Sequence, residues 1–273
     1  METLKTKTLV YDGNCPMCNW YTGKMVNAGL INEHNRVAFE QLEFNSICQL
    51  NLTRARHEIP MIDNNTGEVL YGLDALMVVF ANAYPLLNPV ITKAWFKKLL
   101  WPLYHFISYN RRIIAGGASE AQATLNFAPN FNLGWRFALI AAGFGYTALC
   151  ICAFAWLMAL NSLLLLACVA GYFLLLLIFD FAYTNTNEAK IDYLGHLAVL
   201  GFVEGTIFVL TAVLAKITGL TGLMFAGQGA GRLVAIWLHA KRVENNHYNK
   251  NLNYAFAFGA IALVILIAVF KNQ

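Results

Sequence analysis

The chain has 273 residues, of which 58% are hydrophobic and only 12% are charged, and its formal net charge is +4. Soluble domains are about 25% charged, so a soluble globule of this composition would leave a large apolar surface in water. The small net charge, without a basic stripe interleaved with aromatic residues, argues against nucleic-acid binding. The composition therefore predicts a membrane protein of one or two domains.

We expect no secretion signal at the N-terminus, METLKTKTLVYDG. It lacks the apolar stretch of about 7–15 residues and the small-residue cleavage site of a signal peptide. We therefore expect the polar part of the chain, before Phe131, to stay in the reducing compartment where it is made. Stable structural disulfides are uncommon in such a compartment.

The polar part alternates strand and helix signals. Asn14 is the expected N-cap of the first helix, and Pro16 falls near its first position, where proline is tolerated. Strand-forming runs and a turn at Asn64–Gly67 predict a later hairpin. The expected order of strand, helix, strand, hairpin and helix falls on residues 8–11, 15–28, 36–39, 60–71 and 74–83. With a further helix before the hairpin, this is the element order of a thioredoxin fold.

The segment 95–109 has apolar residues at helical spacing, and Pro102 is expected to split it into two helices. Together with Arg111 and Arg112, the region 95–115 suits an interfacial helix on an anionic inner leaflet. The alternative is a last helix that packs on the soluble domain.

Cys15 and Cys18 form the motif Cys-Pro-Met-Cys directly after the first predicted strand. A zinc site needs four ligands, and Cys48 and His57 are the nearest soft candidates. A structural disulfide is disfavoured by the reducing compartment. The third alternative is a catalytic dithiol, for which no metal and no other cofactor is expected.

A Cys-x-x-Cys that opens a helix places the first sulfur near the positive end of the helix dipole, which stabilises thiolate. We expect Cys15 to be the exposed nucleophile and Cys18, one turn later, the more buried resolving thiol. Pro16 bears no charge and supports the helix start. Asp12 is expected to raise the pKa of a nearby thiol, to relay protons to Cys18, or only to form a turn.

The stretch from Asp12 to Cys18 resembles the signature of the DCC family of thiol–disulfide oxidoreductases, named for D-x-x-C-x-x-C. Further matches are Val10-Tyr11, Gly67…Tyr71-Gly72…Asp74-Ala75-Leu76, and Tyr109-Asn110-Arg111-Arg112. The resemblance covers about residues 7 to 115 and implies a thioredoxin-like fold with Cys15 and Cys18 as the redox pair. It supplies no substrate and does not extend to the apolar half.

Pro60 stands before the third predicted strand. In thioredoxin-like folds a cis-proline at this point faces the dithiol, and its backbone receives the substrate. We therefore expect a cis Ile59–Pro60 bond, although a trans proline at the start of a strand is the alternative.

Five apolar runs follow, each near the roughly 20 residues that span a bilayer as a helix. They fall at 137–159, 163–179, 194–215, 217–238 and 252–270, with a tight turn at Asn161-Ser162. Lysine and arginine concentrate on the segments that share a side with the N-terminus, which predicts an N-in, C-out topology. The expected plan is a thioredoxin-like domain at 1–115, a linker at 116–132 and a transmembrane helical domain at 133–273.

Ionisable residues within predicted spans are costly and often functional. Glu204 and Arg232 fall at similar depth on antiparallel helices and are expected to form a structural pair or a proton, ion or quinone site. Asp180, His196 and His239 fall near inner helix ends, where they are expected to cluster. The two histidines would ligate haem or metal, or serve as interfacial hydrogen-bonding residues.

Cys150, Cys152 and Cys168 lie toward the outer half of the first two spans. They would serve a transmembrane dithiol relay or act as small buried hydrophobic residues. A stripe of small residues in the fourth span predicts close helix packing rather than nucleotide binding; its glycines are Gly222, Gly227, Gly229 and Gly231.

These observations predict a multi-pass inner-membrane thiol–disulfide oxidoreductase with its thioredoxin-like domain in the cytoplasm. Cys15 would attack, Cys18 would resolve, and Pro60 would help to dock the substrate. The expected partners are a disulfide or dithiol substrate or redox protein, the lipid bilayer, and other subunits of a membrane complex. The alternative is a membrane scaffold, assembly or carrier subunit whose soluble domain is a binding module or redox sensor.

Overall fold

The computed structural model describes residues 4–42, 50–117, 127–159, 161–184, 186–220 and 222–271, with side chains as far as residue 262. The chain forms two compact units, Met1–Trp135 and Arg136–Gln273, here called unit 1 and unit 2. The finer division with a linker at 116–132 stays a prediction, because residues 118–126 lie outside the described part.

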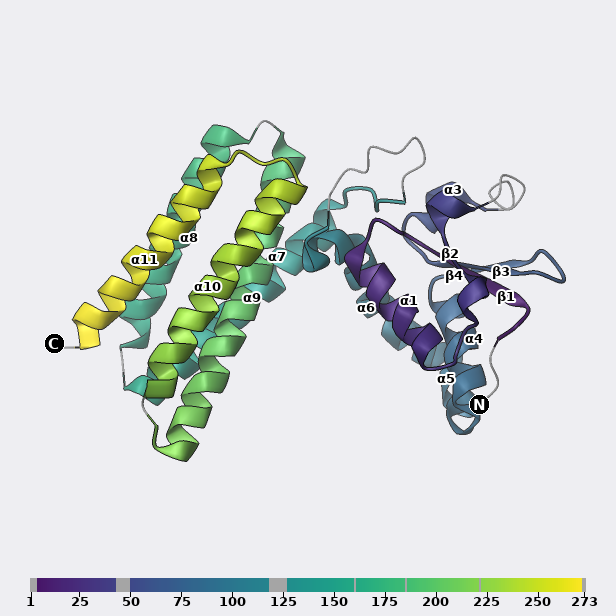
Figure 1. The fold of residues 1–273 in the computed structure, drawn as a ribbon, viewed down its shortest axis with the longest axis horizontal. Coiled ribbons are helices and arrows are strands. Elements are labelled where there is room, and N and C mark those ends of the chain that lie inside the picture. The colour runs from purple at the N-terminus through teal and green to yellow at the C-terminus, as the bar shows by residue number, and fades with distance from the viewer. Residues whose placement is uncertain are drawn as a thin grey trace. The chain divides into compact units, whose positions relative to one another are not determined.

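Unit 1 is a mixed β/α unit with a four-stranded sheet (Figure 1). Its strands are β1 (Lys7–Tyr11), β2 (Arg36–Ala38), β3 (Pro60–Asp63) and β4 (Val69–Tyr71). Its α-helices are α1 (Pro16–Asn27), α3 (Leu52–Ala55), α4 (Leu73–Ala83), α5 (Asn88–Ile91) and α6 (Ala94–Ala115). This is the predicted order of elements, except that the second strand ends before Phe39, which begins a short 3-10 turn.

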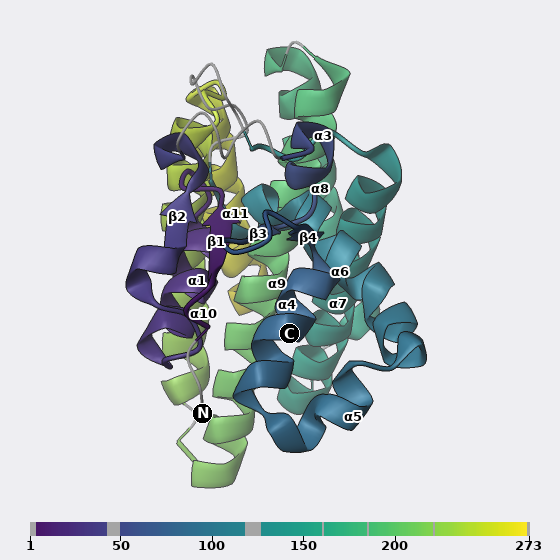
Figure 2. The same ribbon diagram turned by 90° about the vertical axis from the view of Figure 1, so that its right-hand side faces the viewer.

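The strands lie in the order β2-β1-β3-β4, as Figure 2 shows. β1 and β2 are parallel, whereas β1 with β3 and β3 with β4 are antiparallel. The hairpin between β3 and β4 turns at Asp63, whose carboxylate accepts from the backbone N–H of Asn65 at 2.9 Å. Gly67 closes the turn with φ of 72°, a left-handed conformation that glycine adopts at low cost. The predicted thioredoxin-like topology is confirmed.

Successive residues of β1 point to opposite faces of the sheet, as the period of two requires. Leu9 and Tyr11 pack with residues of α1 and α4, whereas Val10 packs with Phe39 and Phe127 on the other face. Helix α6 contacts both α1 and α4. The end of β1, the start of α1 and the second half of α6 thereby meet at one place.

Two local predictions are wrong. Cys15, not Asn14, is the N-cap of α1, because Pro16 occupies the first helical position. Pro102 lies inside a continuous α6 rather than splitting it. The helix tolerates the missing N–H because it is anchored on both sides of Pro102: Lys97 pairs with Asp74 at 2.6 Å, and the Tyr104 hydroxyl accepts from a backbone N–H of unit 1 at 3.1 Å.

Unit 2 consists of long helices (Figure 1). They are α7 (Leu133–Met158), which begins in unit 1, α8 (Ser162–Tyr183), α9 (Asn187–Thr218), α10 (Gly222–Asn245) and α11 (Asn251–Lys271). Among the helices described, α7, α8 and α9 are long and apolar enough to cross a membrane. Helix α10 covers the fourth predicted span but carries Gln228 and Arg232, so the count of five spans stays a prediction. The predicted turn at Asn161 is confirmed, since its side chain accepts from the backbone N–H groups of Leu163 and Leu164.

Small residues let the helices of unit 2 approach closely. A Cβ on Gly143 of α7 would lie 2.8 Å from Ala198 Cβ of α9, and one on Gly227 of α10 would clash with Thr211 Oγ1 of α9. Gly229 has no atom within 4 Å of such a Cβ. Part of the predicted small-residue stripe is therefore a packing surface, as expected for closely packed membrane helices.

Candidate redox site

The two cysteines lie where β1 passes into α1. The Cys15 N–H donates to the Asp12 carbonyl at 3.1 Å, and this turn carries the chain from the sheet into the helix. Cys15 is 0% exposed and Cys18 is 4% exposed. The expected difference in exposure is therefore wrong, because both thiols are buried in the core between α1, α4 and the sheet.

The two thiols nevertheless differ in acidity. A hydrogen bond from the Cys18 side chain is the main cause that lowers the pKa of Cys15 to about 7, against opposition from burial. The same hydrogen bond, with burial, raises the pKa of Cys18 far above its ordinary value. Arg111 also lowers the pKa of Cys15, whereas Asp12 raises it slightly, in the expected direction. Cys15 is thus the thiol poised to become thiolate and Cys18 the proton donor beside it.

Asp12 is more than a turn residue, because it is the centre of a buried ion cluster. Its carboxylate accepts from Arg111 Nη2 at 3.1 Å and from Arg112 Nη2 at 3.0 Å, and all three side chains are less than one-tenth exposed. Arg111 also donates to the carbonyls of Arg56 and Phe127. The two arginines therefore face inward and do not meet a lipid leaflet, which corrects that part of the interfacial-helix prediction.

Pro60 begins β3 and lines the same cavity as Cys18, but its peptide bond is not cis, since the described residues contain no cis peptide bond. The neighbouring backbone groups are already paired within the domain. The Ile59 N–H donates to the Tyr104 hydroxyl at 3.1 Å, and the Ile59 carbonyl accepts from the Gly72 N–H at 2.8 Å. This pairing with α6 and the hairpin holds the segment in place without a cis bond.

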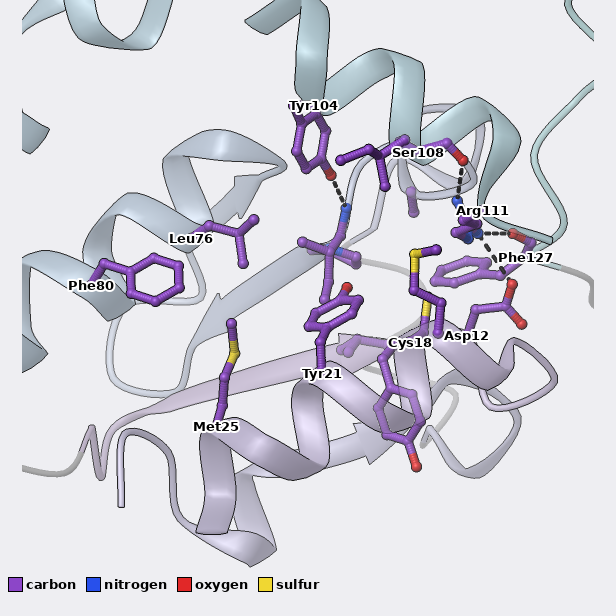
Figure 3. A pocket seen from close by; sticks show the side chains of 17 residues that line it. Asp12, Cys18, Tyr21, Met25, Leu76, Phe80, Tyr104, Ser108, Arg111 and Phe127 are labelled. Atoms are coloured by element: carbon purple, nitrogen blue, oxygen red, sulfur yellow. Dashed lines mark hydrogen bonds and ion pairs between the residues drawn. The ribbon is translucent and has the colours of Figure 1, made fainter. Parts of the chain in front are cut away.

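A cavity of about 300 Å³ lies against Cys18 between the sheet, α1, α4 and α6. In Figure 3 one end holds Cys18, Asp12 and Arg111, and the other end holds Met25, Leu76 and Phe80, with Tyr21 and Tyr104 between them. Burial raises the pKa of Tyr104 to about 12, so its hydroxyl stays protonated at neutral pH. Cys15 does not line this cavity.

Unit 2 brings one predicted pair together. Arg232 Nε lies 2.8 Å from Glu204 Oε1, and both side chains are nearly buried. Asp180 and His196 are buried in α8 and α9. His239 uses both ring nitrogens within the bundle, with Tyr193 and Asn253 each at 2.9 Å, which favours the hydrogen-bonding alternative over metal ligation.

Of the described residues, His57 and the other cysteines take no part in the site. Cys150 packs against Gly205 of α9, and Cys152 and Cys168 are half-buried; each of the three is a free thiol. His57 stacks on Tyr109 with ring centroids 4.4 Å apart, and Cys48 lies outside the described residues.

Sequence reasoning did not assign Arg111, Arg112, Tyr21 or Tyr104 to the site. The signal was present for the arginines, because they close the motif that carries the family resemblance and Asp12 opens it. Their separation of about 100 residues hides the pairing from local patterns. Tyr21 and Tyr104 gave no comparable signal.

A four-stranded thioredoxin-like sheet with a dithiol at the head of the first helix defines a thiol–disulfide oxidoreductase domain. Residues 9–116 match the family described as DCC1-like thiol-disulfide oxidoreductase, and this part of the chain is such a domain. The matched range contains both cysteines and the whole Asp12 cluster, so the resemblance drawn from the sequence is confirmed. No curated protein and no solved structure matches the chain.

Proposed function

We propose that the protein is a membrane-anchored thiol–disulfide oxidoreductase that acts at the cytoplasmic face. The observation that carries this proposal is the asymmetric thiol pair at the start of α1. Cys15 is favoured as thiolate by a hydrogen bond from Cys18, and Cys18 keeps its proton. Nucleophilic attack requires the thiolate, so this asymmetry assigns the first attack to Cys15.

The chemistry balances without a further cofactor. The Cys15 thiolate attacks one sulfur of a substrate disulfide, which forms a mixed disulfide and releases the other sulfur as a thiolate that takes up a proton. Cys18 then loses its proton and attacks Cys15 Sγ. The second substrate thiol leaves, and the protein retains a Cys15–Cys18 disulfide after giving up two electrons. The reverse sequence oxidises a substrate dithiol.

The Asp12 cluster supports this chemistry by holding the turn before Cys15 in place and by its net charge. It ties the turn before Cys15 to the end of α6 through Arg111 and Arg112. The net positive charge of one carboxylate with two guanidinium groups favours thiolate nearby. We expect Asp12 to position the loop and Arg111 to tune the thiols, rather than Asp12 to act as a proton relay.

We place the protein in the inner membrane, with unit 1 in the cytoplasm. Three helices of suitable length and composition support a multi-pass anchor, and the distribution of lysine and arginine supports an N-in topology. The surface of α5 and α6 also suits lipid, because Lys93 and Lys98 are exposed beside large apolar side chains. Exposed apolar residues of α6 and of the 3-10 turn before α5 include Leu86, Leu87, Trp95, Leu99, Leu103 and Ile107.

A second candidate function is a membrane scaffold, assembly or carrier subunit whose thioredoxin-like domain is a binding module or a redox sensor. The buried Glu204–Arg232 pair favours it, because ionisable groups at membrane depth often mark functional sites. The two candidates differ in what inactivates the protein. Cys15→Ser and Cys18→Ser abolish the first function. Glu204→Gln or Arg232→Gln abolishes the second function, for which the cysteines are not needed.

The deciding experiment is a redox titration of the full chain in detergent. The protein is equilibrated in glutathione buffers of defined potential and alkylated, and the state of Cys15 and Cys18 is read by mass spectrometry. We expect a reversible two-electron transition between about −120 and −270 mV, the range of known oxidoreductases. Cys150→Ser serves as the control and should leave the midpoint unchanged. A pair that never oxidises in these buffers contradicts the proposal.

A further inference from the structure

The cavity beside Cys18 has the shape and lining of a small-molecule site. Its volume of about 300 Å³ lies at the lower end of known ligand pockets. Most of its lining is apolar or aromatic, and its few polar groups gather at the Cys18 end (Figure 3). A ligand that fits therefore has a polar head next to the sulfur and an apolar remainder.

One polar atom at this end has no partner. Arg111 lines the cavity and is 8% exposed, yet its Nε–H makes no hydrogen bond to any described residue. A buried N–H without an acceptor is costly. The ligand's head should therefore carry an acceptor such as a carbonyl oxygen, and Tyr104, which accepts from Ile59, still has its own O–H to donate.

The cavity reaches the protein surface at two of its lining residues. Phe80 of α4 and Ile107 of α6 both line the cavity, and they are 37% and 39% exposed. Ile107 continues a row of exposed apolar residues one and two turns earlier on α6, Leu103 and Leu99. A molecule dissolved in a bilayer that touches this row would meet the mouth of the cavity without crossing water.

A protein disulfide fits this site less well. Both sulfurs are buried, and the Ile59 backbone groups that would pair with an extended substrate chain already bond to Tyr104 and Gly72. A lipophilic molecule with carbonyl oxygens at one end meets each requirement of the cavity.

We propose that the cavity binds a membrane quinone, with its ring beside Cys18 and a carbonyl oxygen on Arg111, and with its tail leaving past Ile107. The inference rests on the proposed redox role of Cys15 and Cys18. The dithiol gives two electrons and two protons to the quinone, which becomes hydroquinone, and the two sulfurs close into a disulfide. Quinone reduction thereby returns the pair to its oxidised form after each reaction with a substrate dithiol.

The test uses the reduced full chain in detergent with decylubiquinone, a short-tailed quinone. We expect one hydroquinone formed for each Cys15–Cys18 disulfide, read by ultraviolet absorbance and by mass spectrometry of the alkylated protein. Ile107→Trp fills the mouth and should slow the reaction by about tenfold or more. Leu99→Trp adds the same ring on the same apolar row, away from the cavity, and should leave the rate unchanged.

Binding is measured separately on the double variant Cys15→Ser, Cys18→Ser, by quenching of tryptophan fluorescence on addition of decylubiquinone. Saturable quenching that Ile107→Phe weakens supports the site even if the dithiol has no redox activity. If the double variant shows no binding, or if Ile107→Trp reacts as fast as the unmodified chain, the proposal is overturned. The glutathione titration of the unmodified chain is independent of quinone, so it shows whether the redox function itself has failed.

Discussion

Each unit contains a buried carboxylate paired with arginine, and the two arrangements differ. In unit 1, Asp12 binds two guanidinium groups from the end of α6, and Arg111 also donates to three backbone carbonyls. In unit 2, Glu204 meets the single Arg232 on the neighbouring helix, in a closely packed bundle that also holds a second pair of this kind, Arg136 with Asp192. The first arrangement joins distant parts of the chain around a reactive site, whereas the second adds one polar contact to helices that already fit.

The difference suggests what holds each unit together. A charge removed from a multiply bonded cluster leaves several buried groups without partners, so its loss is expensive. Single polar contacts between membrane helices contribute little, because the separated helices also find partners. We therefore expect unit 1 to depend on its ion cluster and unit 2 on the closeness of its helices.

The largest expected effect is that of Asp12→Asn, which leaves two buried arginines without a counter-charge and should destabilise unit 1 by about 3–5 kcal/mol. Urea unfolding of the reduced full chain, followed by alkylation of the buried Cys15 and Cys18, reports on this unit alone. Asp63→Asn makes the same change at a partly exposed pair with Lys7 and should have little effect. Equal responses of the two variants would show that the Asp12 cluster is not essential for the stability of unit 1.

Cys18→Ala removes the hydrogen bond that stabilises the Cys15 thiolate, so the pKa of Cys15 should move from about 7 to 9 or above. Cys18→Ser keeps a donor and should hold the pKa low. Thiolate absorbance as a function of pH, with Cys15→Ser as the blank, measures the pKa of Cys15 in each variant. In the unmodified protein the thiol regains its proton below about pH 7, so attack on disulfides should slow by about tenfold per pH unit there. A pKa near 7 in Cys18→Ala would instead assign the effect to Arg111 or to the helix.

Close packing in unit 2 is tested by two alanines in one helix. Gly143→Ala places a Cβ 2.9 Å from the Ala198 carbonyl oxygen and should cost about 1–3 kcal/mol, because the backbone cannot move aside easily. Gly145→Ala, two residues later, meets nothing within 4 Å and should leave stability unchanged or slightly raised. Loss of helical circular dichroism on heating in detergent compares them. Similar melting of both variants would show that the contact between α7 and α9 matters little.

The smallest effect is expected for the Glu204–Arg232 pair of unit 2. A double-mutant cycle of Glu204→Gln and Arg232→Gln should give a coupling of no more than about 1.7 kcal/mol, the upper end seen between membrane helices. Thermal melting of the unmodified chain, the two single variants and the double variant gives the four stabilities that the cycle compares. A coupling as large as the effect of Asp12→Asn would make the two ion groups equivalent and remove the distinction between the units.

Much of the fold could be predicted, because it depends on local signals. The alternation of Leu9, Val10 and Tyr11 across the sheet, the Pro16 start of α1 and the turn before Gly67 follow from periods and backbone preferences of single residues. The long helices of unit 2 follow from their apolar composition. Where a local rule failed, as at Pro102, tertiary contacts on both sides outweighed it.

The sequence by itself also determined where the candidate dithiol lies, because two cysteines three positions apart directly after a strand stand at the start of a helix. Only the tertiary structure decided how that dithiol is surrounded. The pairing of Asp12 with residues about 100 positions away, the burial of Cys15, and the cavity between α1, α4 and α6 arise from packing. Such contacts depend on three-dimensional distance, and the free energy of a buried charge depends on every group around it, which no local pattern records.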